Sequence, residues 1–81
     1  MGHKVFIVED EPDLRDTLKY NLENEGFSVE AFSNGETFLS SVDKNIPNLV
    51  ILDLMLPGVS GLDVCRELRS NENYDGIGIV M

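Results

Sequence analysis

Two short apolar runs, each followed at once by acidic residues, constrain this sequence more than any other feature. Residues 4–8 (KVFIV) precede the acidic run at residues 9–11, and residues 49–52 (LVIL) precede Asp53. Apolar residues fill both runs without alternating with polar ones, which is typical of strands buried on both faces of a parallel sheet. We therefore expect helices on both sides of a sheet.

Segments with helical spacing separate the predicted strands. Leu14, Leu18 and Leu22 recur every fourth residue between Pro12 and Gly26, which predicts a helix with these leucines on its buried face. Two further helices are expected over residues 36–44 and 61–69. The side chains expected to face inward from these two helices are Phe38, Leu39, Val42, Leu62, Cys65 and Leu68.

Two more strands complete the pattern. Alternating apolar residues over 27–31 predict a strand with one wetter face, and residues 77–81 predict a fourth strand after a polar connection at residues 70–75. The order βαβαβαβ indicates an α/β fold with a parallel sheet and right-handed crossovers. With 81 residues, one small domain is the most that the chain can form.

Charge and composition narrow the function. Six Lys and Arg residues against 15 Asp and Glu residues give a net charge of −9, which repels nucleic-acid phosphates and anionic lipids. A divalent cation or a basic partner suits this charge better. The single cysteine, Cys65, cannot form an internal disulfide, and no run of about 18 apolar residues could span a membrane. We expect no membrane contact and a cytoplasmic location.

Acidic residues follow both apolar strands, and this arrangement predicts a site. In open α/β sheets ligands bind beyond the carboxyl ends of the strands. If the first and third strands are neighbours, Glu9, Asp10 and Asp53 converge there, and their repulsion should raise at least one pKa unless a cation neutralises it. Carboxylate oxygens suit Mg²⁺. A carboxylate in such a site can attack phosphorus and form an aspartyl phosphate.

A purely structural interpretation exists for each half of this pattern. Acids beside a helix N-terminus stabilise the helix dipole, so residues 9–11 could do only that. Asp53 alone could simply form a turn. Their joint occurrence at the ends of two buried strands favours the functional interpretation.

Residues 8–12 (VEDEP) and 52–61 (LDLMLPGVSG) resemble the two signature segments of response-regulator receiver domains. The resemblance implies a flavodoxin-like, doubly wound parallel sheet with strand order 2-1-3-4. It implies that Asp53 is the phospho-acceptor and that Glu9 and Asp10 are the acidic pair that binds Mg²⁺ together with Asp53.

The segment after Asp53 carries the rest of the resemblance. Met55 falls where the family supplies a backbone carbonyl to the magnesium, and Pro57 and Gly61 match the loop after the acceptor. The resemblance is greatest to regulators with a winged-helix DNA-binding domain. It implies a receiver module of a two-component phosphorelay that is phosphorylated by a sensor histidine kinase and is not a classical enzyme. DNA would be contacted only through an effector domain outside this chain.

The resemblance covers the family's first two-thirds, so residues 1–81 are expected to form a partial, truncated receiver domain. The family's switch Ser or Thr would lie just beyond Met81, and its phosphoryl-binding lysine and its fourth and fifth helices would follow. We therefore expect impaired signalling and a homodimer or higher oligomer through the open edge of residues 77–81. The alternative is a purely structural, self-assembling fragment without phosphorylation activity.

A third hypothesis is an enzyme, a phosphatase of the haloacid-dehalogenase type with an aspartate nucleophile. That family carries a second aspartate two residues after the first. Met55 occupies this position here, which argues against the hypothesis.

Overall fold

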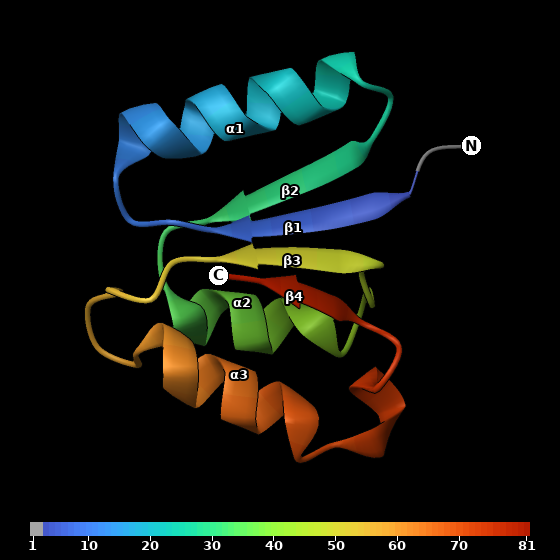
Figure 1. Ribbon diagram of the computed structural model, residues 1–81. Helices are drawn as coiled ribbons and strands as arrows, with labels where there is room; N and C mark the ends of the chain where they lie inside the picture. The colour runs from blue at the N-terminus through green and yellow to red at the C-terminus, as the bar shows by residue number, and fades with distance from the viewer. Residues whose placement is uncertain (1–2) are drawn as a thin grey trace.

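A computed structural model describes residues 3–81. Their strands form one four-stranded parallel sheet with the strand order β2-β1-β3-β4, and helices connect the strands. The elements are β1 (Lys4–Val8), α1 (Pro12–Asn24), β2 (Ser28–Phe32), α2 (Gly35–Val42), β3 (Leu49–Leu52), α3 (Gly61–Arg69), a short 3-10 helix η1 (Glu72–Tyr74) and β4 (Gly78–Val80). The predicted α/β fold and strand order are confirmed, and every strand ends at the same edge of the sheet (Figure 1).

Side-chain caps determine where the three long helices begin. Glu11, Asn34 and Ser60 directly precede α1, α2 and α3. Their side-chain oxygens accept hydrogen bonds from backbone N–H groups of the first turns at 2.9, 2.8 and 3.2 Å. These bonds satisfy donors that have no partner within the helix, so each helix begins at a defined residue beside the carboxyl edge of the sheet.

The face of the sheet beneath α2 and α3 holds the larger core (Figure 1). Phe6 of β1, Phe32 of β2 and Phe38 of α2 meet there with ring centroids 5.2 to 6.0 Å apart, in tilted and edge-to-face arrangements. Such arrangements match the charge distribution of aromatic rings. This aromatic group fixes α2 against the first two strands.

Helix α1 covers the other face and buries less. Val5, Ile7 and Val29 form the core there, and Leu18 and Leu22 of α1 pack on it while partly exposed. The prediction that Leu14 is buried is wrong, since Leu14 is 48% exposed. The first turn of α1 lies beyond the carboxyl ends of β1 and β2, where no strand is available for packing (Figure 1).

Two other predictions need correction. Leu62 is 51% exposed, because the buried side of α3 runs through Gly61, Val64 and Leu68, and Cys65 is only half-buried. The predicted residues lie three apart, and in a helix of 3.6 residues per turn such positions move progressively around the surface. The buried residues lie three and then four apart, so they stay on one side of α3.

The segment predicted as a polar connection contains η1, and its Tyr74 is buried in the larger core. The strand at residues 49–52 was expected to be buried on both faces, but Leu49 and Ile51 are only half-buried beneath α1. Within residues 3–81, no helix combines the length and the apolar character that a bilayer crossing requires.

Candidate metal centre

The carboxyl ends of β1 and β3 lie side by side and carry the acidic residues out of the sheet together. Val8 pairs with Leu52 in the parallel register, so Glu9 and Asp53 are the next residues on adjacent strands. The backbone N–H of Asp53 donates to the Val8 carbonyl at 3.0 Å, which extends the ladder by one bond. The sheet itself thus determines how closely the two side chains approach.

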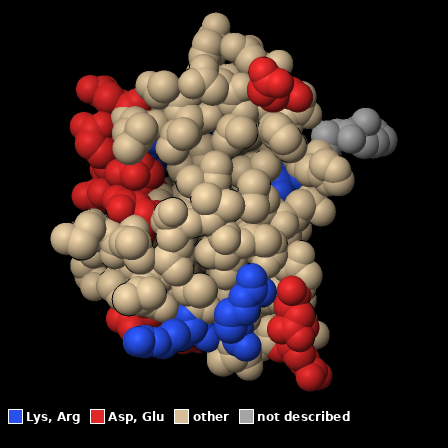
Figure 2. All heavy atoms as spheres, viewed as in Figure 1, with Lys and Arg blue, Asp and Glu red and all other residues tan. Residues whose placement is uncertain are grey.

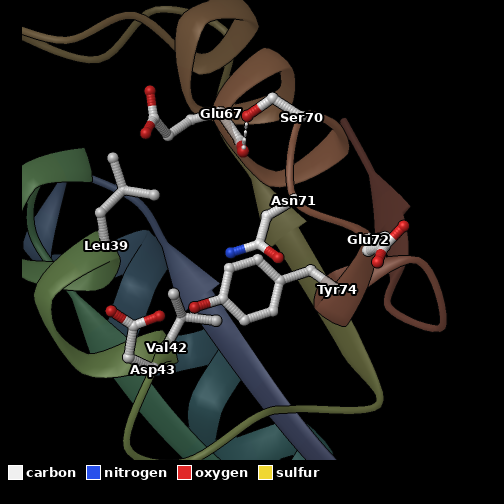
Figure 3. A pocket seen from close by; sticks show the side chains of 8 residues that line it. All are labelled: Leu39, Val42, Asp43, Glu67, Ser70, Asn71, Glu72 and Tyr74. Carbon is white, nitrogen blue, oxygen red and sulfur yellow. Dashed lines mark hydrogen bonds between the residues drawn. The ribbon is translucent and has the colours of Figure 1, made fainter.

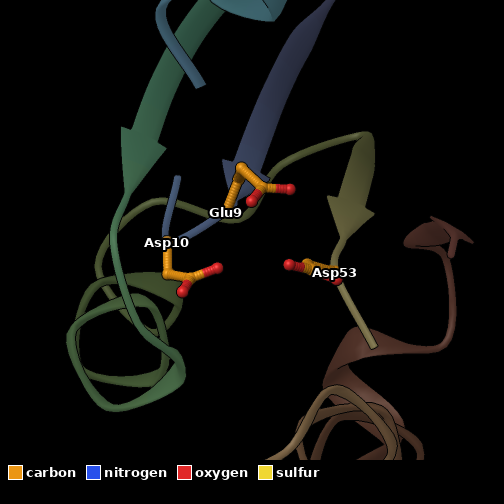
Figure 4. Close-up of side chains that lie close together, drawn as sticks. All are labelled: Glu9, Asp10 and Asp53. Carbon is orange, nitrogen blue, oxygen red and sulfur yellow. The ribbon is translucent and has the colours of Figure 1, made fainter. Parts of the chain in front are cut away.

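Glu9, Asp10 and Asp53 each offer one carboxylate oxygen, and these three oxygens lie within 4.8 Å of one another (Figure 4). Glu9 is only 9% exposed, Asp53 is half-buried and Asp10 is exposed. Further acidic side chains gather along the same edge of the molecule, on the left of Figure 2. The structure therefore brings together the three acids that the sequence singled out.

Backbone N–H groups fix the orientation of two of the carboxylates. The N–H of Glu11 donates to Oε2 of Glu9 at 3.1 Å, and the N–H of Met55 donates to Oδ1 of Asp53 at 3.0 Å. The Met55 side chain points away from the core and its residue is 83% exposed. Met55 thus contacts Asp53 through its main chain, while its predicted role as a carbonyl ligand stays a prediction.

Arg15 supports the acidic loop, a role that was not predicted from the sequence. Its Nη1 donates to the backbone carbonyls of Glu9 at 3.0 Å and Asp10 at 3.4 Å. A guanidinium suits this task because its donors form a rigid, permanently charged fork. The sequence signal was an arginine in the first turns of the helix that follows the acids, a position from which it can reach back to the loop.

The loop after Asp53 depends on glycine at two positions. A Cβ on Gly61 would lie 2.3 Å from the backbone oxygen of Asp53, so the loop and the start of α3 approach too closely for any side chain. Gly58 follows Pro57 and has a φ of +72°, a combination that suits a tight turn. Pro57 lies in this loop and Gly61 is the first residue of α3, directly after it, while their predicted part in the acceptor site stays a prediction.

Burial raises the pKa of Glu9 above its ordinary value of 4.5. The N–H of Glu11 opposes this effect, while the nearby charges of Asp53 and Asp10 add to it. The pKa is raised because negative charge is gathered in a partly dehydrated place without a compensating cation.

The donor set fits a small hard cation. Mg²⁺ binds oxygen at about 2.0–2.1 Å, so oxygens bound to one ion lie about 3–4 Å apart. Three carboxylate oxygens within 4.8 Å reach that separation with small side-chain rotations. A bound cation would also relieve the repulsion that raises the Glu9 pKa.

A pocket of about 360 Å³ opens beside the acids on the α1 side of the sheet. Glu9 and Asp53 line it together with Leu18, Ile51 and Met81. The acids are therefore reached from the side of the sheet that α1 covers incompletely.

Comparison with known proteins identifies similar chains. The family model for the response regulator receiver domain matches residues 5–81. The phosphate regulon transcriptional regulatory protein PhoB of Rhizobium meliloti is 44% identical over 78 residues, covering 96% of this chain and 34% of that protein. The DNA-binding response regulator MtrA of Mycolicibacterium smegmatis is 42% identical over 81 residues, all of this chain and 34% of MtrA. The chain thus spans about a third of the length of these relatives.

Solved structures show the same architecture. The response regulator TrrA of Thermotoga maritima in complex with Mg²⁺ and BeF is 37% identical, with a TM-score of 0.87 over 98% of this chain and 66% of that one. TrrA in complex with the histidine kinase ThkA gives a TM-score of 0.85 over 98% of this chain and 67% of TrrA, at the same identity.

Proposed function

Because this chain belongs to the response regulator receiver domain family, we propose that Asp53 accepts a phosphoryl group from a sensor histidine kinase in a two-component phosphorelay. The observation that carries the proposal is the meeting of Glu9, Asp10 and Asp53 at the ends of two adjacent buried strands. TrrA, which has the same fold, has been solved both with Mg²⁺ and BeF and with a histidine kinase.

The proposed step transfers the phosphoryl group from a kinase imidazole to a carboxylate. The Met55 N–H holds Oδ1 of Asp53, and this bond orients the carboxylate so that one oxygen can attack phosphorus. A bond forms between that oxygen and phosphorus, the bond between phosphorus and the histidine nitrogen breaks, and the nitrogen keeps the electron pair.

Glu9, Asp10, Asp53 and the backbone carbonyl of Met55 would hold Mg²⁺. When bound, the cation supplies positive charge that offsets the negative charge on the transferred oxygens. Arg15 keeps the loop that carries Glu9 and Asp10 in shape through its bonds to their carbonyls. Arg15 is a positioning residue in this scheme.

The wider role follows from the relatives. The chain spans about a third of PhoB and MtrA, which are transcriptional or DNA-binding regulators by name. We propose that residues 1–81 are part of the receiver domain of a cytoplasmic transcription regulator, with DNA bound through another domain. The role is that of a phosphorylated switch, not of a turnover enzyme.

Acetyl phosphate tests the proposal. Incubation with Mg²⁺ should add one phosphoryl group, seen by intact mass and assigned to Asp53 by peptide mapping. Asp53→Asn should abolish the addition, chelator should suppress it, and Asp16→Asn on the exposed side of α1 should leave it unchanged. Labelling at another residue, or equal labelling of the Asp53→Asn variant, would contradict the proposal.

We also propose that the polypeptide of residues 1–81 alone is phosphorylated slowly. Among the described residues, Arg15 is the cationic side chain that bonds to the acidic loop, and it contacts main-chain carbonyls. No lysine of residues 3–81 is placed to contact the transferred phosphoryl group beside Asp53. The rate of acetyl phosphate labelling should therefore lie well below that of TrrA under the same conditions.

Self-association of this polypeptide is the second candidate property, and the open edge of β4 favours it. Within residues 3–81, β4 pairs with β3 on one side only. Val80 and Met81 are 52% and 50% exposed, and β4 contains neither charge nor proline to discourage pairing. An unpaired strand edge of this kind is a template for a second chain. If the role were purely structural, chains would self-assemble through this unpaired edge of β4.

Light scattering separates the two candidates. Val80→Lys should shift the polypeptide of residues 1–81 toward monomer, because it places a charge at the exposed edge. The matched control is Tyr20→Lys, which charges an exposed residue of α1, outside the edge strand β4. A monomer at tens of micromolar before any substitution would contradict self-association. An oligomer that acetyl phosphate does not label would favour the purely structural role.

A further inference from the structure

A larger pocket of about 510 Å³ lies between α2 and α3, on the side of the sheet opposite to α1 (Figure 3). Its volume falls within the roughly 300–1,000 Å³ that is usual for sites binding small molecules. Leu39 and Val42 of α2 form an apolar wall, and residues from the end of α3 to η1 form the facing wall. The acids at the strand ends do not line this pocket, so a ligand bound here would be separate from the proposed phosphorylation site.

Tyr74 points into the pocket with an unused polar group. Its residue is only 6% exposed, and its ring reaches toward α2 with the hydroxyl on the side of Val42 and Asp43 (Figure 3). Within residues 3–81, the hydroxyl makes no hydrogen bond, although every fully enclosed side-chain oxygen and nitrogen has a partner. The hydroxyl oxygen therefore reaches the open space of the pocket, where a ligand can bind it.

The pocket is negative. Asp43, Glu67 and Glu72 line it, and among the described residues no lysine or arginine does. Both α2 and α3 end beside it, so the negative ends of two helix dipoles add to the carboxylates.

Two nearby hydrogen-bond donors, Arg69 and Ser70, are already bonded to backbone carbonyls and do not neutralise the carboxylates of the pocket. The guanidinium of Arg69 is bonded to the carbonyls of Tyr74, Asp75 and Ile77 at 3.3, 3.4 and 2.7 Å. The Ser70 hydroxyl donates to the backbone carbonyl of Glu67 at 2.8 Å (Figure 3). The Asn71 Oδ1 accepts from the Asn73 N–H at 3.0 Å, so the carboxylates, the Tyr74 hydroxyl and the Asn71 Nδ2 are the groups left to meet a ligand.

We propose that this pocket binds an alkylguanidinium group, either in a small molecule or as an arginine side chain of a partner. The guanidinium donates in a plane to the carboxylate of Asp43 and to the Tyr74 hydroxyl, and the alkyl stem packs on Leu39 and Val42. The Glu67 carboxylate lies at the other end of the pocket and adds negative charge there (Figure 3). A guanidinium suits the pocket better than an ammonium because it is more weakly hydrated and presents five donors in a fixed fork.

Titration followed by amide NMR tests the proposal on the polypeptide of residues 1–81. Butylguanidinium is the probe, and butylurea is its neutral counterpart of nearly the same shape. Butylguanidinium should shift the amide signals of α2, α3 and η1 around the pocket, and butylurea should not. A tripeptide with a central arginine and blocked ends distinguishes the sources: tighter binding of the peptide indicates a protein partner, and equal binding indicates a small molecule.

Matched variants make the result specific. Tyr74→Phe keeps the buried ring and removes the hydroxyl, and Asp43→Asn removes one charge, so each should weaken butylguanidinium binding about tenfold. Asp16→Asn removes one charge on the other side of the sheet and should leave binding unchanged. Equal binding of butylurea, equal weakening by Asp16→Asn, or no shifts around the pocket in a folded chain would each overturn the proposal.

Discussion

The two faces of the sheet are closed to very different degrees. Of the described residues, twelve buried side chains fill the face beneath α2 and α3, whereas three fill the face beneath α1. Helix α1 has no fully buried residue, and Leu49 and Ile51 of β3 stay half-exposed below it. The acids at the strand ends lie beside a pocket on this second face.

The difference suggests that one face of the sheet mainly stabilises the fold and that the other leaves the acidic residues accessible. The α2–α3 face contributes most of the apolar burial, which holds β1 and β3 in register and thereby places Glu9 beside Asp53. The α1 face leaves an approach to those carboxylates. We infer that packing on one face of β1 and β3 stabilises the fold, whereas the opposite face of the same strands leaves Glu9 and Asp53 accessible to a ligand.

The largest expected effect tests this division. Phe38→Ala removes a completely buried ring from the aromatic group, and it should lower the free energy of unfolding by about 3–5 kcal/mol. Leu18→Ala is the counterpart on the α1 face, and partial burial predicts a loss of about 1 kcal/mol. Urea denaturation measures both. Equal losses would show that the two faces contribute alike.

An intermediate effect is expected at Gly61, where the loop that follows Asp53 meets the start of α3. Gly61→Ala forces a Cβ against the Asp53 backbone oxygen, so the free energy of unfolding should fall by about 1–3 kcal/mol. Gly76→Ala is the control, because a Cβ there meets nothing within 4 Å, and its effect should stay within about 0.5 kcal/mol. Similar results for the two glycines would mean that the loop adapts without cost.

The smallest expected effect concerns pH in the absence of divalent cations. The pKa of Glu9 is raised in the folded chain, so the folded state holds this proton more tightly than the unfolded state. The stabilising contribution is complete below the ordinary value of 4.5 and is lost as the pH rises through the folded pKa. Glu9→Gln lacks this titration, so the stability of the variant relative to the parent chain should increase as the pH rises from 4.5 through the folded pKa of Glu9. Thermal melts in chelator measure the difference, and parallel pH profiles would contradict it.

Much of the fold and of the site was predictable from local sequence. Continuous apolar runs identified β1 and β3, and the alternation of strands and helices predicted a parallel sheet. Parallel strands end at one edge, so the acids that follow them had to meet if β1 and β3 were neighbours. The roles of Asp53, Glu9 and Asp10 stay predictions.

Other features could not be predicted because they depend on how the elements pack. Leu14 fits the helical spacing of α1, but its turn extends beyond the strands, and Leu62 lies on the wrong side of α3. Tyr74 stands in a polar segment without periodicity, so nothing local indicated its burial. The pocket that it lines exists only because α2 and α3 end side by side.

Magnesium binding tests the central claim, that three carboxylates at the strand ends form one cation site. Melting of the chain should be compared in millimolar Mg²⁺ and in chelator, because a ligand that binds only the folded state raises the midpoint. At a Mg²⁺ concentration about ten times the dissociation constant, the expected gain is about 1.4 kcal/mol. Asp10→Asn and Asp53→Asn should each reduce the gain, and Asp16→Asn should not. Identical midpoints in Mg²⁺ and chelator, or an undiminished gain in the Asp53→Asn variant, would contradict the account.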